Sequence, residues 1–520
     1  MNEPQRIEAE ATPTRPSRPT AEHHRVVIVG TGFSGLGVAI RLLQSGERDL
    51  VVLERAGDVG GCWRDNTYPG IQCDVQSDVY SFSFAPNASW TRAFPWGGEI
   101  HTYLRHCADR FGVRPYLRLH TEVLDAAWDD DAQRWRIETT TGALTADFLV
   151  SGHGALSSPA KPRLPGIETF GGPVFHSAEW RHDVSLSGKR VAVIGTGASA
   201  IQVVPAIQPE VARLLVFQRS PAWVMPRPDF AVSRARRLLF RQLPAAQRLA
   251  RALRFGMLET RVLGILTRPE LLRVAELAAR RHLRAQVADE RLREQLTPRY
   301  AIGCKRILLS NNFYPALCQP NAALVTTGIR EVTSTGVVTE DGFRRDVDAI
   351  VLCTGFHVAD HPMTQRVRGR DGRSLAEHWE HGALAYLGVN VPGFPNLFLL
   401  GSGPHTGLGH NSIVYMIEAQ IGYLLAALAE LKQRGCATIE VRDEAARSFT
   451  DEMQRRLRGT VWSSGCSSFY LDKEGHNVAL WPGFAATYGW RARRFEADLY
   501  TFRRAAPARA AADGSIGERA

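Results

Sequence analysis

Several features are absent from this sequence, and each absence argues against a class of function. Its eight cysteines, at positions 62, 73, 107, 304, 318, 353, 436 and 466, form no C-x-x-C pair and no zinc-ligand spacing, so no dithiol redox centre and no metal site are predicted. There is also no uninterrupted apolar run of about 18 residues that could span a bilayer. Residues 1–24 lack the apolar core of a signal peptide. We therefore expect reduced cysteines, no integral membrane segment and a cytoplasmic location.

The charge balance is basic but carries no nucleic-acid signature. Lys and Arg number 63 against 53 Asp and Glu, which gives a net charge of +10 and a pI near 9.4. No basic run is interleaved with aromatic residues as in a groove for single strands, so no nucleic-acid partner is predicted. A solvated basic surface is favoured, and anionic ligands or a membrane surface stay open as alternatives. The 520 residues, 44% hydrophobic, suffice for roughly two or three domains.

Residues 25–46, RVVIVGTGFSGLGVAIRLLQSG, predict a strand, a glycine-rich turn and a helix. Gly30, Gly32 and Gly35 would permit the turn, the approach of a pyrophosphate and close packing of the helix on the strand, with Phe33 and Ser34 in the same turn. The next strand ends in Glu54, whose carboxylate suits the hydroxyls of an adenosine ribose. The pattern predicts a dinucleotide site.

Residues 189–207, KRVAVIGTGASAIQVVPAI, repeat the pattern of strand, glycine-rich turn and helix, with Gly195, Gly197 and Ala200 in the turn. The following strand ends in Arg219, and a guanidinium suits a 2′-phosphate, so NADP rather than NAD is expected. The residues predicted to contact it are Gly195, Thr196, Gly197, Ala198, Ser199, Arg219, Ser220 and Lys305. Two dinucleotide folds in one chain indicate a flavin, FAD, that is reduced by NADPH.

The segment 54–84 is dense in glycine, aromatic and acidic residues, which is typical of a loop laid against a ligand. Its order of motifs, GGCW, then YPG, then an aspartate, resembles the flavin side of the class B flavoprotein monooxygenases of Baeyer–Villiger type. The resemblance implies FAD contacts from Gly61, Cys62, Trp63, Tyr68, Asp74 and Tyr80.

Residues 170–180, FGGPVFHSAEW, are similar to that family's fingerprint on the linker between the two nucleotide domains, through Phe170, Gly172, His176 and Trp180. Related N- and S-oxygenating enzymes usually have Tyr or Phe in place of the tryptophan. The fingerprint normally closes with Pro or Asp, whereas this chain has Arg181. Two ring N–H groups and an apolar indole favour a structural role for His176 and Trp180, with proton handling by His176 as the alternative.

Residues 301–325 are similar to the family's lysine-arginine segment, which implies that Lys305 contacts the 2′-phosphate, that Arg306 is the catalytic cation and that Asp74 orients it. A permanently charged guanidinium can stabilise an anionic C4a-peroxyflavin and its adduct with a ketone. The resemblance further implies that Trp462 lies on a loop over NADP. The expected reaction converts a ketone into an ester or lactone with O2 and NADPH.

The predicted fold class is α/β, with two Rossmann-like domains that are discontinuous in sequence. The expected parts are a disordered tail (1–24), the FAD domain (25–160 and 357–503), the linker and NADPH domain (161–225 and 301–356), a helical insert that walls the substrate pocket (226–300) and a disordered tail (504–520). A basic amphipathic membrane contact is the alternative for the insert.

Two alternatives to ketone oxygenation stay open, namely an N- or S-oxygenating flavin monooxygenase and a non-catalytic NADPH-binding flavoprotein sensor or scaffold. A disulfide reductase is disfavoured by the missing C-x-x-C pair. We expect a monomer or a weak homo-oligomer, with a small-molecule ketone and O2 as partners.

Overall fold

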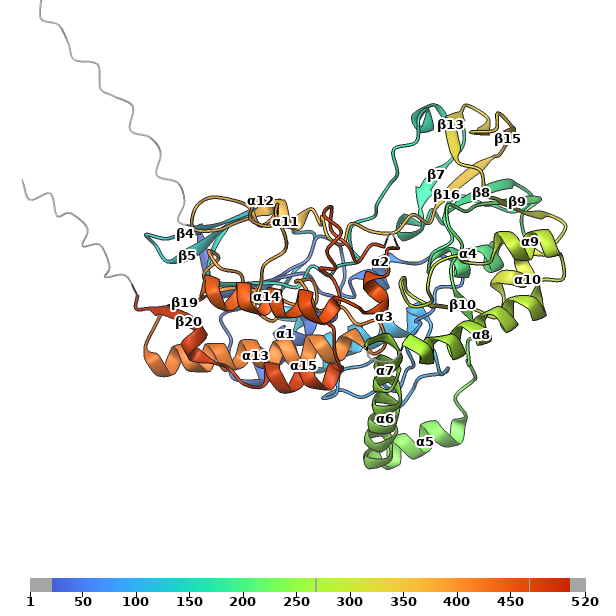
Figure 1. Cartoon of the computed structure of the whole chain (residues 1–520). Helices are drawn as coiled ribbons and strands as arrows, with labels where there is room; N and C mark the ends of the chain where they lie inside the picture. The colour runs from blue at the N-terminus through green and yellow to red at the C-terminus, as the bar shows by residue number, and fades with distance from the viewer. Residues whose placement is uncertain (1–20, 267–268, 467, 506–520) are drawn as a thin grey trace, which may run out of the picture.

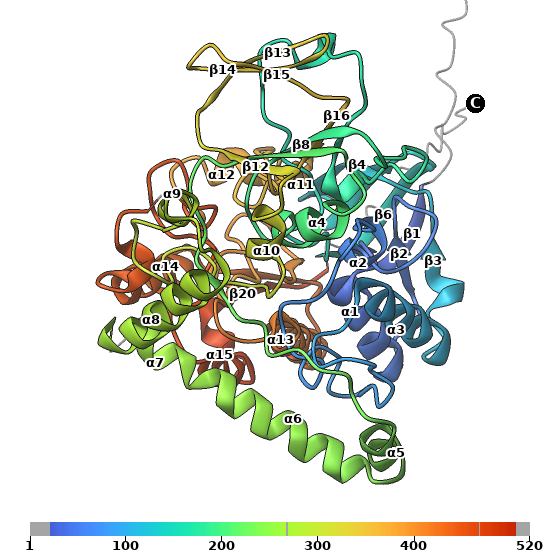
Figure 2. The same ribbon diagram turned by 90° about the vertical axis from the view of Figure 1, so that its right-hand side faces the viewer.

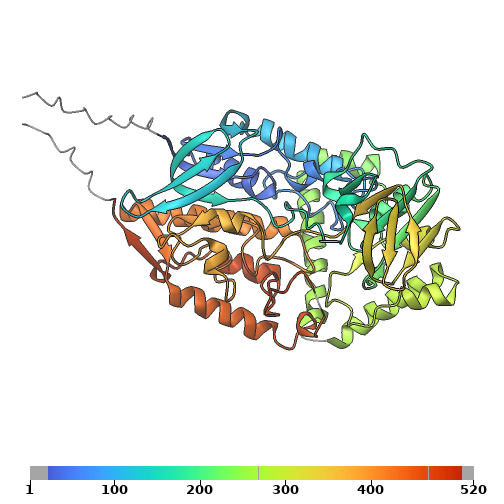
Figure 3. The same cartoon turned by 90° about the horizontal axis from the view of Figure 1, so that it is seen from above.

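The computed structural model describes residues 21–266, 269–466 and 468–505, and they form two lobes side by side (Figure 1). In Figure 3 the first lobe combines the blue start of the chain with its orange and red end, while the second is green and yellow. The first lobe is therefore built from both ends of the chain, as predicted for discontinuous domains.

The sheet of the first lobe follows from the apolar run before the first glycine turn. Strand β1 pairs in parallel with β2 on one side and β6 on the other, and its last four residues are almost fully buried. The strand order is β17-β4-β5-β6-β1-β2-β3, with β18 paired to β6. The strands are β1 (Glu22–Val29), β2 (Leu50–Leu53), β3 (Leu117–Arg118), β4 (Val123–Asp129), β5 (Arg134–Thr139), β6 (Gly142–Ser151), β17 (Val367–Arg368) and β18 (Leu397–Leu399).

Helices cover this sheet and close the first lobe. They are α1 (Phe33–Gln44), α2 (Cys62–Asp65), α3 (Gly97–Arg110), α11 (Met363–Arg366), α12 (Leu375–His378), α13 (Ile413–Arg434), α14 (Asp443–Leu457) and α15 (Ala485–Ala492), with a hairpin of β19 (Thr438–Val441) and β20 (Tyr500–Arg503). Among the described helices, α13 alone is long and apolar enough to cross a membrane, by length and composition. Its side chains pack in the largest hydrophobic core together with those of α1 and α15, which is the position of a core helix.

The second lobe has a five-stranded parallel sheet in the order β12-β9-β8-β16-β7. Its elements are β7 (Val174–His176), β8 (Arg190–Ile194), α4 (Ala200–Ile207), β9 (Arg213–Phe217), α10 (Phe313–Leu317), β12 (Ala322–Val325) and β16 (Ala349–Leu352). A separate antiparallel sheet of β13 (Ile329–Thr333), β14 (Gly336–Thr339) and β15 (Arg344–Asp346) lies at its outer end (Figure 2). The two α/β lobes match the predicted fold class.

The segment predicted as a helical insert is helical. It contains α5 (Arg234–Gln242), α6 (Pro244–Glu259), α7 (Arg261–Leu266), α8 (Pro269–Gln286) and α9 (Glu290–Gln295). Just before it, β10 (Val224–Met225) pairs with β11 (Leu308–Leu309). Helix α6 runs along the outside of the molecule (Figure 2) and bonds to the first lobe, through Arg251 to the Ser81 carbonyl at 2.9 Å and through Glu259 to Asn411 at 2.8 Å. Of the described residues in the predicted insert, 226–300, only Tyr300 at its end lines the main cavity, so its helices do not form the cavity wall and instead connect the two lobes.

The predicted N-terminal tail is also too long. Residues 22–24 belong to β1, where Glu22, His23 and His24 pair with Leu144, Thr145 and Ala146 of β6. These residues are polar because this end of the strand extends beyond the buried core and is exposed, so the sequence shows no strand pattern here. Most of the two predicted tails, namely residues 1–20 and 506–520, lies outside the described residues.

Candidate active site

The first glycine turn joins β1 to α1 at the edge of a large cavity. Gly30 has a φ of +92°, and a Cβ there would lie 2.8 Å from the carbonyl oxygen of Gly152. A Cβ on Gly35 would lie 1.8 Å from the carbonyl oxygen of Gly30, so Gly35 allows α1 to pack on β1 and does not itself line the cavity. Gly32 does line the cavity and faces Gly61, whose Cβ would approach the Gly32 Cα to 2.9 Å. The turn therefore leaves a narrow backbone cradle that fits a pyrophosphate.

Glu54 follows β2 directly and is buried at the same edge. Its carboxylate accepts hydrogen bonds from the backbone N–H of Thr31 at 3.1 Å and from the Thr31 hydroxyl at 2.6 Å, and it pairs with Arg64 at 3.0 Å. It also lines the cavity. The carboxylate is thus locked in one orientation, with part of its surface available to a ribose.

The second glycine turn, between β8 and α4, borders the same cavity. Gly195 has a φ of +113°, and a Cβ there would lie 2.3 Å from the carbonyl oxygen of Cys353. A Cβ on Gly197 would meet no described atom within 4 Å. The space beside the backbone of this turn, next to the first turn of α4, is therefore open to a ligand. Thr196, Ala198 and Ser199, which the sequence assigns to NADP, line the cavity here. This geometry fits a second pyrophosphate.

Beyond β9, two cations converge on the cavity. Lys305 donates a hydrogen bond to the Ser220 hydroxyl at 3.2 Å and lies 4.8 Å from the ring centre of Tyr300. Burial and the nearby positive charge of Arg219 lower the pKa of Lys305. An anion between the two cations would relieve this repulsion, so Arg219, Ser220 and Lys305 together suit a phosphate.

The two predicted catalytic residues form an ion pair. The Nε of Arg306 donates to Oδ2 of Asp74 across 2.6 Å, although 232 positions separate them in the chain. The negative charge of Asp74 raises the pKa of Arg306 above its ordinary value. Burial alone would raise the pKa of Asp74, but the charge and hydrogen bond of Arg306 outweigh it and lower that pKa. Each side chain exposes 30% of its surface, and both line the cavity, so the pair stays charged while facing it.

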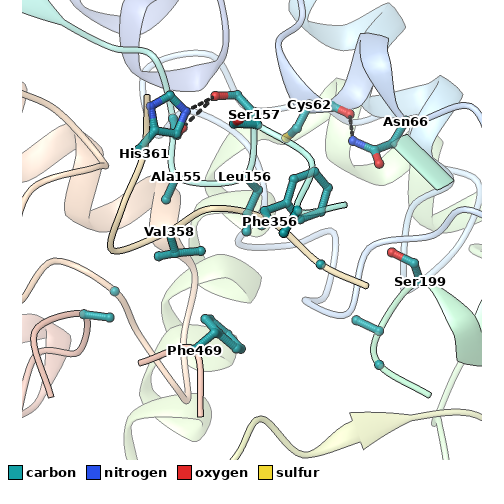
Figure 4. A pocket seen from close by; sticks show the side chains of 18 of the residues that line it. Cys62, Asn66, Ala155, Leu156, Ser157, Ser199, Phe356, Val358, His361 and Phe469 are labelled. Atoms are coloured by element: carbon teal, nitrogen blue, oxygen red, sulfur yellow. Dashed lines mark hydrogen bonds between the residues drawn. The ribbon is translucent and has the colours of Figure 1, made fainter. Parts of the chain in front are cut away.

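The cavity has a volume of about 1660 Å³ and lies between the two lobes. Apart from Gly35 and Trp462, every predicted catalytic or cofactor-binding residue lines it. Apolar side chains from separate segments, Leu156, Phe356, Val358 and Phe469, also face it (Figure 4). One continuous space therefore connects both glycine turns with the Arg306–Asp74 pair.

The aromatic segment after Glu54 forms one wall of this space. Trp63 donates its indole N–H to the Tyr80 hydroxyl at 3.1 Å, and Phe33 meets Tyr80 edge to face at 5.3 Å between ring centres. Tyr68 lies within 3.2 Å of the Gln202 side chain of α4, which links this wall to the second lobe. Burial raises the pKa of the Cys62 thiol to about 12, so Cys62 packs as a neutral group.

The linker fingerprint lies behind the site and not in it. His176 is fully buried on the edge strand β7, where its Nδ1 accepts the backbone N–H of Ala178 at 3.1 Å. Trp180 packs edge to face on Phe175 at 5.1 Å. A Cβ on Gly172 would lie 2.4 Å from the Asp348 carbonyl oxygen, and Phe170 packs in the core behind the sheet. None of the four lines the cavity, which favours the structural interpretation of the fingerprint.

The position of Trp462 differs from the prediction. It lies in the 3-10 turn η4 (Val461–Ser463) and is only 3% exposed, in a core with Cys304 and Tyr470. A Cβ on Gly409 would lie 2.9 Å from the Trp462 ring, so the indole packs against backbone and does not line the cavity. The residues of this loop that do line it are Ser468, Phe469 and Tyr470, which the sequence pattern did not single out.

The expectation that all cysteines are reduced is wrong for one pair. Cys304 and Cys466 form a disulfide with a Cα–Cα distance of 6.3 Å across 162 positions. Spacing rules search for cysteines near one another in sequence, and these two meet only because the loop after η4 folds back onto the segment before Lys305.

Two further groups were missed by the sequence interpretation. The carbonyl oxygen of Leu408 lies 3.5 Å from an Nη of Arg306 and so adds a second acceptor beside the guanidinium. Ser157 lies 2.9 Å from Nε2 of His361, and both residues line the cavity (Figure 4). Neither contact has a local motif, since each joins residues from distant segments.

Comparison with known proteins agrees with this arrangement. Residues 23–367, more than half of the chain, match the family model described as flavin-binding monooxygenase-like. The chain belongs to this flavin-binding monooxygenase-like family. Within it, the chain is 51% identical over 493 residues to a protein of Streptomyces coelicolor named Baeyer-Villiger monooxygenase, covering 94% of this chain and 95% of the relative. A protein of the same name from Pseudomonas aeruginosa is 49% identical, covering 94% and 93% of the two chains.

Solved structures of this family share the two-lobed fold. Steroid monooxygenase bound to NADP superposes with a TM-score of 0.81 at 33% identity, covering 93% of this chain and all of that one. Cyclohexanone monooxygenase from Rhodococcus sp. Phi1 bound to NADP+ gives a TM-score of 0.83 at 27% identity, covering 94% of this chain and all of the other. The predicted family and fold class are therefore confirmed.

Proposed function

We propose that this flavin-binding monooxygenase uses FAD, NADPH and O2 to insert one oxygen atom beside a ketone carbonyl. The balanced reaction is ketone, O2, NADPH and a proton to ester or lactone, NADP+ and water. The observation that carries the proposal is the Arg306–Asp74 pair, which faces a cavity bordered by two dinucleotide turns. The relatives named Baeyer-Villiger monooxygenase support the same reaction.

The residues present fit both cofactors. Gly30, Gly32, Gly61 and Glu54 would hold FAD at the first turn, and the cradle between Gly32 and Gly61 has no room for a Cβ on the second of these. NADPH would be held at the second turn by Gly195, Gly197, Arg219 and Lys305. The two cations among them would bind its 2′-phosphate. When bound, NADPH supplies a hydride and FAD carries the electrons that activate O2.

The chain's own contribution to the chemistry is a fixed positive charge. Oxygen insertion beside a carbonyl places negative charge on the attacking oxygen and then on the carbonyl oxygen. Arg306 stays protonated throughout, since its pKa is raised by Asp74, and its Nη groups are free of the bond that its Nε makes. Asp74 holds the guanidinium plane in place and takes no proton from it.

An N- or S-oxygenating reaction would not need this cation to stabilise negative charge on a carbonyl oxygen, and a sensor would not need the ion pair to face the cavity.

We include in the proposal a cytoplasmic location, because NADPH is supplied there, and a monomer or weak homo-oligomer. Light scattering on the purified chain would test the oligomeric state.

The test is product analysis. Purified enzyme with FAD is incubated with NADPH and oxygen and with panels of cyclic, aryl and long-chain ketones, sulfides and amines. Ester or lactone that appears in step with NADPH consumption supports the proposal. Products only from the sulfide or amine panel, or hydrogen peroxide with every compound, would contradict it.

A further inference from the structure

The disulfide between Cys304 and Cys466 joins the two segments that shape one end of the cavity. Cys304 directly precedes Lys305 and Arg306 in sequence. Cys466 lies on the loop that continues to Ser468, Phe469 and Tyr470, which line the cavity. The bond therefore ties the segment that carries the catalytic cation to a loop that faces it.

Packing around the bond makes the two segments a single unit. Cys304 is fully buried and shares a core with Val461, Trp462 and Tyr470. A Cβ on Gly303 would lie 3.3 Å from a methyl group of Val461, so the backbone before Cys304 lies against the turn η4. Cys466 itself is only half buried, and the three residues before it are exposed. The bond is thus anchored at one sulfur and accessible near the other.

Next to Cys466 the bonds of the loop are local, since Ser463 and Ser464 donate their hydroxyls to the carbonyls of Leu457 and Val461 in the preceding turn. Farther along, the carbonyl oxygen of Tyr470 accepts the backbone N–H of Val478 at 3.1 Å. Tyr470 is buried in the core that holds Cys304, and it lines the cavity together with Arg306. Burial raises the pKa of its phenol, although the charge of Arg306 opposes the shift. If the bond at Cys466 is absent and the loop moves, the surroundings of Arg306 therefore change.

We propose that Cys304 and Cys466 are a redox-reversible pair whose disulfide fixes the loop carrying Phe469 and Tyr470 against the segment of Lys305 and Arg306. In the disulfide state the loop is ordered before NADP+ binds, so less entropy is lost on binding. In the dithiol state the nucleotide is held more weakly. The proposal relies on the proposed function only for the identity of the nucleotide and the source of the oxidant.

The oxidant is hydrogen peroxide, which a flavin monooxygenase releases when oxygen activation is not coupled to substrate. The accessible Cys466 sulfur attacks one peroxide oxygen, the O–O bond breaks, and a sulfenic acid and one water form. The Cys304 sulfur then attacks Cys466, the S–S bond forms and a second water leaves. Two thiols and one peroxide give one disulfide and two waters, and a thiol reductant reverses the change.

The first experiment measures the bond itself. The FAD-loaded full chain is treated with a stoichiometric amount of hydrogen peroxide or with a phosphine reductant, denatured, alkylated and mapped by mass spectrometry without reduction. We expect the peptide pair linked through Cys304 and Cys466 after peroxide and two alkylated thiols after reduction. Recovery of both cysteines as alkylated thiols from the peroxide-treated chain would overturn the proposal.

The second experiment measures the consequence, as the dissociation constant of NADP+ by equilibrium titration. We expect binding to weaken about three- to tenfold in the reduced chain and in Cys466→Ser, since a loop must then be ordered on binding. The matched control is Cys318→Ser, which removes an exposed free cysteine outside the cavity and should leave the constant unchanged. Equal constants for the oxidised and reduced wild-type chains would overturn the proposal.

Neither readout requires a ketone, so the two proposals can fail separately. A redox-dependent NADP+ constant without any ester would leave the disulfide proposal standing and remove the proposed function. Ester formation with the same NADP+ dissociation constant in both redox states would support the proposed function and remove the disulfide proposal. Reduction of the wild-type chain also covers the case in which the Cys466 variant does not fold.

Discussion

Arg306 and Asp74 meet at 2.6 Å between Nε and Oδ2, one on the segment after the helical insert and the other in the aromatic loop of the first lobe. The contact therefore depends on the two lobes being correctly placed. Because Asp74 is bonded through Nε, the terminal nitrogens of the guanidinium remain available to a reacting group, although one of them also lies 3.5 Å from the Leu408 carbonyl oxygen.

The first prediction concerns this charge. Arg306→Ala should still oxidise NADPH and release hydrogen peroxide, while the rate of ester formation falls by about a hundredfold or more, since a preorganised cation is lost. Parallel assays of NADPH, peroxide and ester measure this split. Asp74→Asn should give a smaller loss, because the amide oxygen can still accept from Nε but no longer supplies the charge. Ester formation at the wild-type rate in Arg306→Ala would contradict the role assigned to the arginine.

The second prediction concerns the choice of nucleotide. Arg219→Ala and Lys305→Ala should each raise the KM for NADPH about ten- to a hundredfold, which is the range of a charge-assisted hydrogen bond to a phosphate. The KM for NADH should hardly change, because NADH lacks the 2′-phosphate. Steady-state kinetics with both nucleotides measures this.

Arg213→Ala is the matched control for that pair of variants. Arg213 is exposed at the start of β9, at the end of the strand away from the cavity, so its removal changes the net charge by the same amount. An equal rise in the KM for NADPH in this variant would show that general charge, and not the phosphate cluster, explains the effect.

Local patterns predicted the parts of the site that lie on strand-turn-helix units. Gly30, Gly195, Glu54 and Arg219 occur at fixed offsets from a buried strand, and the physical demands of a pyrophosphate are local demands on the backbone. The Arg306–Asp74 pair could be predicted only through the resemblance to a family, because no spacing rule connects positions 74 and 306.

Three of the errors share one physical cause, which is the path of a loop that no local pattern determines. The disulfide of Cys304 and Cys466, the burial of Trp462 and the exposure of Phe469 to the cavity all follow from the path of one loop. The helical insert was recognised from its period, but a helix period does not tell which lobe its apolar face will meet.

The third prediction concerns the packing of α1 on β1. Gly35→Ala should lower the thermal midpoint of unfolding and the amount of bound FAD, since the new Cβ would lie 1.8 Å from the Gly30 carbonyl oxygen and must move the helix. The expected loss is about 2–4 kcal/mol, in the range of severe overpacking. Thermal unfolding and flavin absorbance of the purified variant measure both effects.

Gly422→Ala provides the control within a helix. A Cβ at Gly422 would meet no described atom within 4 Å, and the residue lies in the middle of α13. This variant should be neutral or more stable by up to about 1 kcal/mol, because alanine favours the helix. Similar destabilisation in both variants would argue that the close approach at Gly35 is not the cause.

The fourth prediction concerns Glu259, a buried carboxylate at the end of α6. It accepts hydrogen bonds from His410 Nε2 at 3.0 Å and from the backbone N–H of Ala486 at 3.0 Å, in addition to Asn411. Burial raises its pKa, but these bonds outweigh burial and the net shift is downward. Glu259→Gln should therefore lower the free energy of unfolding by about 2–3 kcal/mol at pH 7, because one buried donor loses its acceptor.

The sign of the pH dependence follows from that shift. A carboxyl whose pKa is lower in the folded chain stabilises the fold above its unfolded pKa of about 4.3 and loses this contribution as the pH falls through the folded value. The difference in stability between wild type and Glu259→Gln should accordingly be constant from pH 7 to about pH 5 and narrow below it. Thermal or urea unfolding across this range measures it. Glu276→Gln, which removes a half-exposed carboxylate paired with Arg280 on α8, is the control and should cost less than about 0.5 kcal/mol. A difference that widens as the pH falls would mean that the Glu259 carboxyl is protonated in the folded chain.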